Sequence, residues 1–347
     1  MPADPSSPPA APRFAARPSE VPSAGIALRL EGVVRRFGDV TALDHFTLRV
    51  ARGEVVGLLG HNGAGKTTTV RLLAGLLAPD DGSVAVHGID PLLDGSGVRQ
   101  RLGVLPARPV VDDRLTGTQN LAFAGAVFGL PAALIAERAA ELLATFGLTD
   151  RGDARVGGYS TGMRQRLSLA RVLVSDPDVL LLDEPTAALD PVAARQVRRT
   201  LGSLAREAER TVVICTHDLA EAEALCDRVV VLAQGRTIAE GSPAELAAAH
   251  GSGGLHLEVS GDSTERAMAL VRDQAVAGEL GVERPAVEVV EPGRLRVRGV
   301  ARDAVPILIR MLLEAGVELF EVRRETPTLE EVYLALHGEV PDEEERA

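Results

Sequence analysis

The sequence predicts an α/β domain built on a largely parallel sheet, followed by a smaller α+β domain. Short, nearly continuous apolar runs such as residues 179–183 and 211–216 alternate with helical patterns, and such runs suit strands buried on both faces of a parallel sheet. A Gly-Ser-Gly-Gly stretch at 251–254 marks a boundary. The patterns beyond it follow the order of a split βαβ, ferredoxin-like domain.

The expected domains are a leader at 1–25, an α/β domain at 26–247, an accessory domain at 255–338 and an acidic tail at 339–347. The leader contains seven prolines and almost no periodic apolar pattern, so we expect it to be disordered. Residues 115–175 read as almost purely helical, which predicts a separate helical lobe within the α/β domain.

Individual elements of the α/β domain follow from the same patterns. The predicted strands cover residues 27–30, 47–50, 54–60, 179–183, 211–216 and 229–232, and the predicted helices cover 67–76, 132–146, 161–175, 191–207 and 219–225.

The accessory domain shows no cluster of catalytic side chains, so we interpret it as a regulatory or dimer-forming module. Its predicted strands cover 255–260, 286–290, 294–299 and 317–323, and its predicted helices cover 264–276 and 302–315.

Composition excludes several classes of function. The net charge of -12 comes without a basic stripe, so no nucleic-acid partner is expected. Two cysteines cannot build a disulfide framework and fit a reducing cytoplasm. The longest apolar run, 121–136, is shorter than the roughly 20 residues of a membrane span.

A phosphate-binding loop follows the strand at 54–60. The segment Gly60-His-Asn-Gly-Ala-Gly-Lys66-Thr67 matches G-x-x-x-x-G-K-[ST] between a strand and a helix. Its glycines turn backbone N–H groups toward phosphates, Lys66 reaches the outer phosphates and Thr67 binds Mg²⁺. Lys66 is also the only lysine in the chain, and a compact ammonium suits this position better than a guanidinium. The expected ATP-binding residues of the loop are Gly60, His61, Asn62, Gly63, Ala64, Gly65, Lys66, Thr67 and Thr68.

Two carboxylates end the apolar strand Val179-Leu-Leu-Leu-Asp183-Glu184. We expect Asp183 to hold Mg²⁺ together with Thr67, and Glu184 to polarise the attacking water as a general base. Acids at a strand end are weak evidence alone, but together with the loop they form the second half of an ATP-hydrolysing site.

Three further motifs resemble the nucleotide-binding subunits of ABC transporters. The segment Tyr159-Ser-Thr-Gly-Met-Arg-Gln-Arg-Leu167 lies upstream of the carboxylates, and the Ala188-Leu-Asp190 turn and Thr216-His217-Asp218 lie downstream. The motifs occur in the order and spacing of the family over residues 27–245. The resemblance implies a P-loop ABC-type nucleotide-binding domain with a helical subdomain.

The family pattern also implies roles for individual residues. Each ATP lies between the phosphate loop of one subunit and the Ser160, Thr161 and Gly162 signature of another, in a head-to-tail homodimer or heterodimer. His217 contacts the γ-phosphate and supports Glu184, whereas Asp190 communicates across the dimer. Phe37 stands where the family has an aromatic that stacks on adenine, and a core position is its alternative interpretation.

Two positions depart from the family pattern. Ala107 stands where a glutamine usually touches magnesium, so coupling would rely on a neighbour such as Arg108 or on water. Thr161 replaces the commoner glycine of the signature.

The sequence therefore predicts an ATP- and Mg²⁺-dependent ATPase that powers transport, with export favoured by resemblance to multidrug and antibiotic exporter ATPases. It would lie in the cytoplasm on the inner face of the membrane and dock separate transmembrane permease subunits near residues 115–130. The alternatives are a soluble ABC ATPase with a non-membrane partner and a module that binds nucleotide without hydrolysing it.

Overall fold

The computed structural model describes residues 25–333, except for 208, 251–253, 274–285, 299, 301, 325–327 and 331. The predicted leader, apart from Gly25, and the acidic tail lie outside the described residues. The chain divides into two compact units, one ending at Ser242 and the other beginning at Pro243. Each unit is described by itself.

A six-stranded sheet forms the centre of the first unit, in the order β5-β6-β7-β3-β8-β9. All neighbouring pairs are parallel except β8 and β9. The predicted parallel sheet is thus confirmed, and every residue of β3, β6 and β7 is buried. The strands are β3 (Val55–Leu59), β5 (Leu102–Leu105), β6 (Val179–Asp183), β7 (Thr211–Thr216), β8 (Arg228–Ala233) and β9 (Arg236–Gly241).

A second sheet of three antiparallel strands, in the order β2-β1-β4, contains the predicted strands at 27–30 and 47–50. The short apolar runs at 27–30 and 47–50 do not by themselves distinguish these strands from those of the parallel sheet. Alternation reveals the difference: Phe46, Leu48 and Val50 of β2 are buried, and the residues between them are exposed. Such alternation is typical of an antiparallel sheet with one solvated face. The strands are β1 (Ile26–Phe37), β2 (Val40–Ala51) and β4 (Asp81–Val86).

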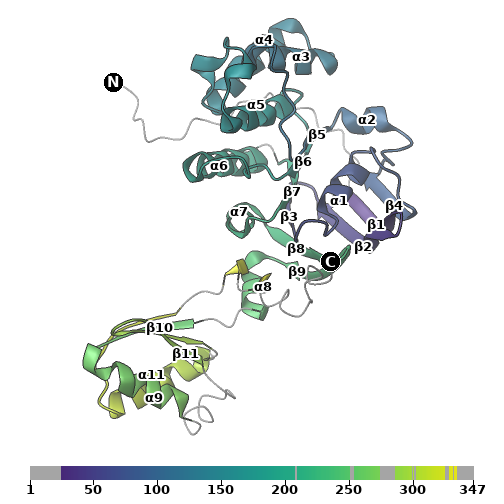
Figure 1. Cartoon of the computed structure of the whole chain (residues 1–347). Helices are drawn as coiled ribbons and strands as arrows, with labels where there is room; N and C mark the ends of the chain where they lie inside the picture. The colour runs from purple at the N-terminus through teal and green to yellow at the C-terminus, as the bar shows by residue number, and fades with distance from the viewer. Residues whose placement is uncertain are drawn as a thin grey trace. The chain divides into compact units, whose positions relative to one another are not determined.

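Helices cover both sides of the parallel sheet in the first unit (Figure 1). α6 and α7 lie on one side of β6, β7 and β3, and α1 lies on the other side beside the antiparallel sheet. α3, α4 and α5 contact one another and form the predicted helical lobe. The helices are α1 (Lys66–Leu73), α2 (Gly95–Arg99), α3 (Gly117–Val127), α4 (Ala132–Thr145), α5 (Thr161–Leu173), α6 (Pro191–Glu207) and α7 (Leu219–Leu225), with 3₁₀ turns η1 (Thr149–Arg151) and η2 (Val156–Gly158).

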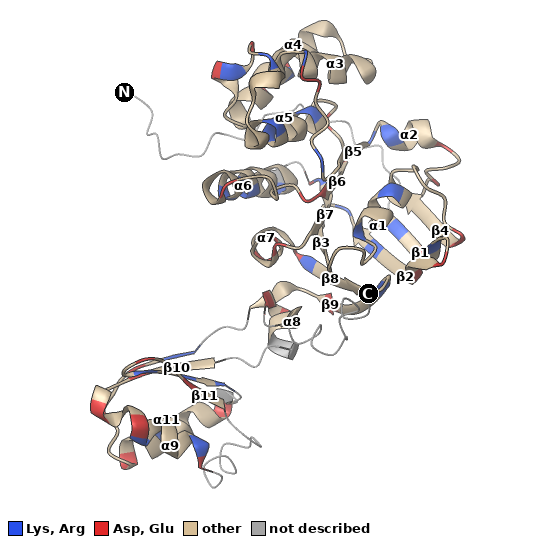
Figure 2. Ribbon diagram, viewed as in Figure 1, with Lys and Arg blue, Asp and Glu red and all other residues tan. Residues whose placement is uncertain are grey.

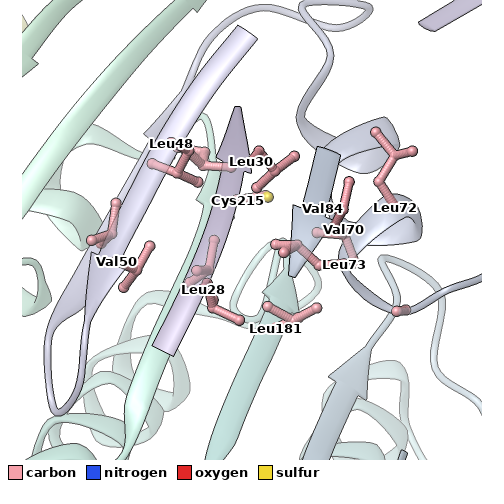
Figure 3. Close-up of a cluster of buried hydrophobic side chains, with 14 of the residues drawn as sticks. Leu28, Leu30, Leu48, Val50, Val70, Leu72, Leu73, Val84, Leu181 and Cys215 are labelled. Carbon is pink, nitrogen blue, oxygen red and sulfur yellow. The ribbon is translucent and has the colours of Figure 1, made fainter. Parts of the chain in front are cut away.

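The core of the first unit joins both sheets through α1. Leu72 of α1 is fully buried in one cluster with Leu28 of β1 and Leu181 of β6 (Figure 3). Because the helix that begins at Lys66 packs against both sheets, its N-terminus is held in a fixed position.

Leu72→Ala is expected to lower the free energy of unfolding by about 2–5 kcal/mol, because it removes a buried side chain and leaves a cavity. Leu76→Ala is the matched control, since Leu76 is 71% exposed and surface changes usually stay within about 0.5 kcal/mol. Urea unfolding of both variants measures the difference. Equal effects would contradict the packing of α1 described above.

The second unit is an antiparallel sheet in the order β11-β12-β10-β13 with α9 and α11 packed against it. Its strands and helices follow the predicted order, and the ferredoxin-like assignment stays a prediction. Leu257, Leu295 and Leu308 lie in its own buried cluster. The elements are α8 (Pro243–His250), β10 (Gly254–Val259), η3 (Gly261–Ser263), α9 (Thr264–Arg272), β11 (Ala286–Glu291), β12 (Arg294–Arg298), η4 (Arg302–Ala304), α11 (Val305–Glu314) and β13 (Leu319–Arg324).

Charged residues are distributed over most elements of both units, with basic and acidic positions interleaved along the ribbon (Figure 2). No helix among the residues that the structure describes has both the length and the apolar character needed to cross a bilayer.

Candidate functional site

The phosphate loop lies between β3 and α1 and packs closely against β2 and β8. A Cβ atom at Gly65, whose φ is +113°, would lie 2.7 Å from the carbonyl oxygen of Ala42 in β2. One at Gly60 would lie 2.5 Å from the carbonyl oxygen of Leu232. The N–H of Gly235, in the β8–β9 turn, donates to the carbonyl oxygen of Ala64 at 3.2 Å. The close approach explains why glycine is needed at these two loop positions.

Lys66 is the first residue of α1 and is only 6% exposed. Its Nζ donates to the carbonyl oxygens of Gly60 and, at 3.1 Å, of His61. These contacts hold the ammonium against the loop, at the positively polarised end of the helix. Among the other loop residues, His61, Asn62, Gly63 and Thr67 are exposed, Thr68 is half-buried and Ala64 is buried.

The two predicted magnesium ligands meet directly. The hydroxyl of Thr67 donates to Oδ2 of Asp183 at 2.9 Å, although the two residues are 116 positions apart in the sequence. Burial raises the pKa of the Asp183 carboxyl, and the hydrogen bond from Thr67 opposes that effect. No described group of three or more His, Cys, Asp or Glu side chains could hold a metal ion by itself. Mg²⁺ bound with a nucleotide needs only one or two protein ligands beside phosphate and water oxygens, so this oxygen pair fits it.

Glu184 and His217 form the predicted catalytic pair. Nδ1 of His217 lies 2.7 Å from Oε1 of Glu184, and the Glu184 side chain is 16% exposed against 64% for His217. Glu184 adopts a left-handed φ of +53°, while its N–H donates to the carbonyl oxygen of Cys215 at 2.8 Å. This conformation is uncommon for a residue other than glycine, and here it occurs at the predicted general base.

The signature residues begin α5 in the helical lobe. Ser160 is the N-cap, and its Oγ accepts a hydrogen bond from the N–H of Met163 at 3.2 Å. Ser160 and Thr161 are exposed. The capped N-terminus of α5 therefore presents an anion-binding end on an element separate from the phosphate loop.

Asp190 and Phe37 lie at the ends of other elements. Oδ1 of Asp190 accepts from the N–H groups of Val192 and Ala193, both at 3.0 Å, at the start of α6. Phe37 ends β1 and is 43% exposed, so the alternative core interpretation is wrong. The Arg35 guanidinium lies 4.8 Å from the centroid of its ring. Ala107 and Arg108, after β5, are both exposed.

The sequence motifs assign no role to two buried polar residues beside the site. Gln165 of α5 and Glu221 of α7 contact Pro185 and Thr186, the two residues that follow Glu184. Polar residues on the buried faces of predicted helices were the available signal. A cleft of about 440 Å³, lined by Glu184, Thr186, His217 and Asp218 among others, opens on this side of the site.

The fold and the site define an ATPase of the P-loop class. Residues 43–187 match the family model described as ABC transporter. The chain is 41% identical over 320 residues to the daunorubicin resistance ATP-binding protein DrrA3 of Streptomyces coeruleorubidus, covering 91% of this chain and 97% of the relative. It is 37% identical over 313 residues to the Nod factor export ATP-binding protein I of Rhizobium sp. (strain N33), covering 90% and 97%.

A solved structure gives the same assignment. The dimeric post-hydrolysis state of the ATP-binding cassette MJ0796, bound to ADP and Pi, matches with a TM-score of 0.57 and 26% identity, over 62% of this chain and 98% of that one. The chain belongs to the ABC transporter family, as an ATP-binding subunit that hydrolyses ATP.

Proposed function

We propose that this subunit drives the export of a small molecule through separate membrane subunits. The observation that supports ATP hydrolysis as the driving reaction is the pairing of Thr67 with Asp183 and of Glu184 with His217 beside the phosphate loop. Two relatives that match over most of the chain are named for drug resistance and for Nod factor export. Their names favour transport over a soluble ABC ATPase with a non-membrane partner.

The residues of the site have distinct roles in hydrolysis. Lys66 and the N–H groups of the loop bind the phosphates, and Phe37 stacks on the adenine. Thr67 and Asp183 would hold Mg²⁺, which neutralises phosphate charge when bound. Glu184 accepts the proton of the attacking water, and His217 orients the Glu184 carboxylate through their contact of 2.7 Å.

A second subunit completes each site in this proposal. Ser160 and Thr161 of the signature are exposed at the N-terminus of α5 in the lobe, so they can contact the ATP of another subunit. Asp190 at the start of α6 would lie near the same interface. The oligomer that the purified chain forms with ATP will show whether an identical chain can serve as the second subunit.

The membrane partner would dock on α3. Phe123 and Val127 are 57% and 67% exposed, and Phe128 just beyond the helix is 40% exposed. Exposed apolar residues grouped on one element mark an interaction surface. The subunit would then lie in the cytoplasm against the inner face of the membrane.

Steady-state phosphate release over a range of protein concentrations tests this function. The rate per molecule is expected to rise with concentration, because each site needs two subunits. In a Phe123→Ala, Val127→Ala double variant this dependence should persist, while the fraction of the chain that sediments with membranes of the producing cell falls. A rate independent of concentration would contradict the shared site, and unchanged sedimentation would contradict the docking surface.

A further inference from the structure

The turn behind the catalytic carboxylate, residues 185–190, is held from one side by Gln165. This glutamine lies in α5, one turn beyond the signature, and is fully buried. Its Nε2 donates to the carbonyl oxygen of Pro185 at 3.1 Å. Its Oε1 has no hydrogen-bond partner in the described part of the chain. Leaving a buried acceptor unmet costs stability, so packing alone does not explain a glutamine here.

Glu221 holds the same turn from the other side. Its Oε1 accepts a hydrogen bond from the hydroxyl of Thr186 at 2.8 Å, and the two residues are 1% and 5% exposed. Glu221 lies in α7, the helix that follows His217 and is capped by Asp218. Burial raises the pKa of the Glu221 carboxyl, and hydrogen bonds from the hydroxyls of Thr216 and Thr186 partly offset that effect. A buried carboxyl at this position is therefore costly, with Oε1 bonded to Thr186 and Oε2 without a hydrogen-bond partner in the described part of the chain.

The turn itself is compact and also touches the signature. The N–H of Leu189 donates to the carbonyl oxygen of Thr186 at 3.0 Å. A Cβ atom added to Gly162 would lie 3.3 Å from Cδ2 of Leu189, so the backbone of the signature packs on this side chain. α5 thus contacts both ends of a turn that begins directly after Glu184 and ends at Asp190.

We propose that Gln165 and Glu221 are positioning residues that clamp this turn between the signature helix and the Glu184–His217 pair. A shift of α5 is transmitted through Gln165 to Pro185, the residue next to Glu184. The contact between Glu221 and Thr186 keeps the turn in a fixed position relative to α7, the helix that follows His217. In the proposed dimer, on which this step rests, the signature of each subunit meets the ATP of the other, so the clamp couples the two ATP sites.

Gln165→Met tests the clamp, because methionine keeps the shape of the side chain and loses the donor. The expected result is a fall in kcat of about tenfold, of the kind that small misplacements of a catalytic group produce. KM for ATP stays within about twofold, and the Hill coefficient for ATP falls toward unity. Gln196→Met, the same change at an exposed position of α6, is the matched control. Unchanged kcat and Hill coefficient in Gln165→Met, or a fall in melting temperature that accounts for the loss, would overturn the proposal.

The opposite anchor has its own conservative test. Glu221→Gln keeps an acceptor for the Thr186 hydroxyl and is expected to retain most of kcat, whereas Glu221→Leu removes the acceptor and lowers kcat as Gln165→Met does. Because both anchors act through one turn, the Gln165→Met, Glu221→Leu double variant should lose less than the product of the single effects. Effects that multiply would show two independent residues and no clamp.

Hydrogen exchange gives a measurement that does not need turnover. Backbone amides of Glu184 and of residues 186–190 are expected to exchange about fivefold faster in Gln165→Met than in the wild type, as for the loss of one hydrogen bond. Unchanged exchange overturns the clamp even if the wild type hydrolyses no ATP, whereas absent turnover in the wild type with faster exchange in the variant refutes only the proposed function.

Discussion

Replacing Glu184 with glutamine is expected to lower the steady-state rate of ATP hydrolysis by about a hundredfold to ten-thousandfold, the range that a general base contributes. Glutamine has nearly the size of glutamate and can still accept a hydrogen bond from His217, whose Nδ1 lies 2.7 Å from the carboxylate. It cannot accept the proton of the attacking water. ATP binding should persist, and ATP-bound dimers should accumulate.

Phosphate release and gel filtration with ATP measure the two parts of this expectation. Glu223→Gln, on the exposed face of α7, is the matched control for the same chemical change and should keep the wild-type rate. Hydrolysis by Glu184→Gln at the control rate would place the base elsewhere. Loss of ATP binding in Glu184→Gln would indicate a damaged site and would contradict the assigned role.

Lys66→Arg is expected to weaken ATP binding by about tenfold to a hundredfold, equal to the loss of one charge-assisted hydrogen bond. The substitution keeps the charge, so electrostatics alone predict a small effect. Lys66 is 6% exposed and its ammonium contacts two loop carbonyls, which leaves little space for the larger planar guanidinium.

Equilibrium titration with a fluorescent ATP analogue measures the change. Arg195→Lys, the reverse exchange at an exposed position of α6, is the control and should bind as the wild type does. An unchanged affinity in Lys66→Arg would mean that the backbone N–H groups of the loop bind the phosphates without a contribution from the Lys66 ammonium.

The parts of the site that consist of contiguous sequence motifs could be predicted from the sequence. The phosphate loop and the carboxylate strand each need only neighbouring residues, and their context of strand, loop and helix was readable from apolar patterns. The contact of 2.9 Å between Thr67 and Asp183 confirms that the two motifs come together. Helix ends were less accurate: α1 ends at Leu73, ahead of the predicted Leu76, because Gly75 turns the chain with a φ of +65°.

Contacts between distant elements could not be predicted in the same way. Gln165 and Pro185 meet only after α5 packs beside the end of β6, and no spacing in the chain encodes that approach. The separate antiparallel sheet was missed because its apolar runs resemble those of a parallel strand over four residues. The alternation that distinguishes them becomes clear only over the seven residues from His45 to Ala51 of β2.

The single lysine confines side-chain amine chemistry to the phosphate loop. Apart from the α-amino group of the chain, Lys66 is the only amine that an acylating reagent could modify. Its burial and its two carbonyl contacts make the reaction slow, and a bound phosphate group would slow it further. The rate at which the loop peptide gains the mass of the acyl group, compared with and without nucleotide, would therefore report occupancy of the loop without a mutation or an attached dye.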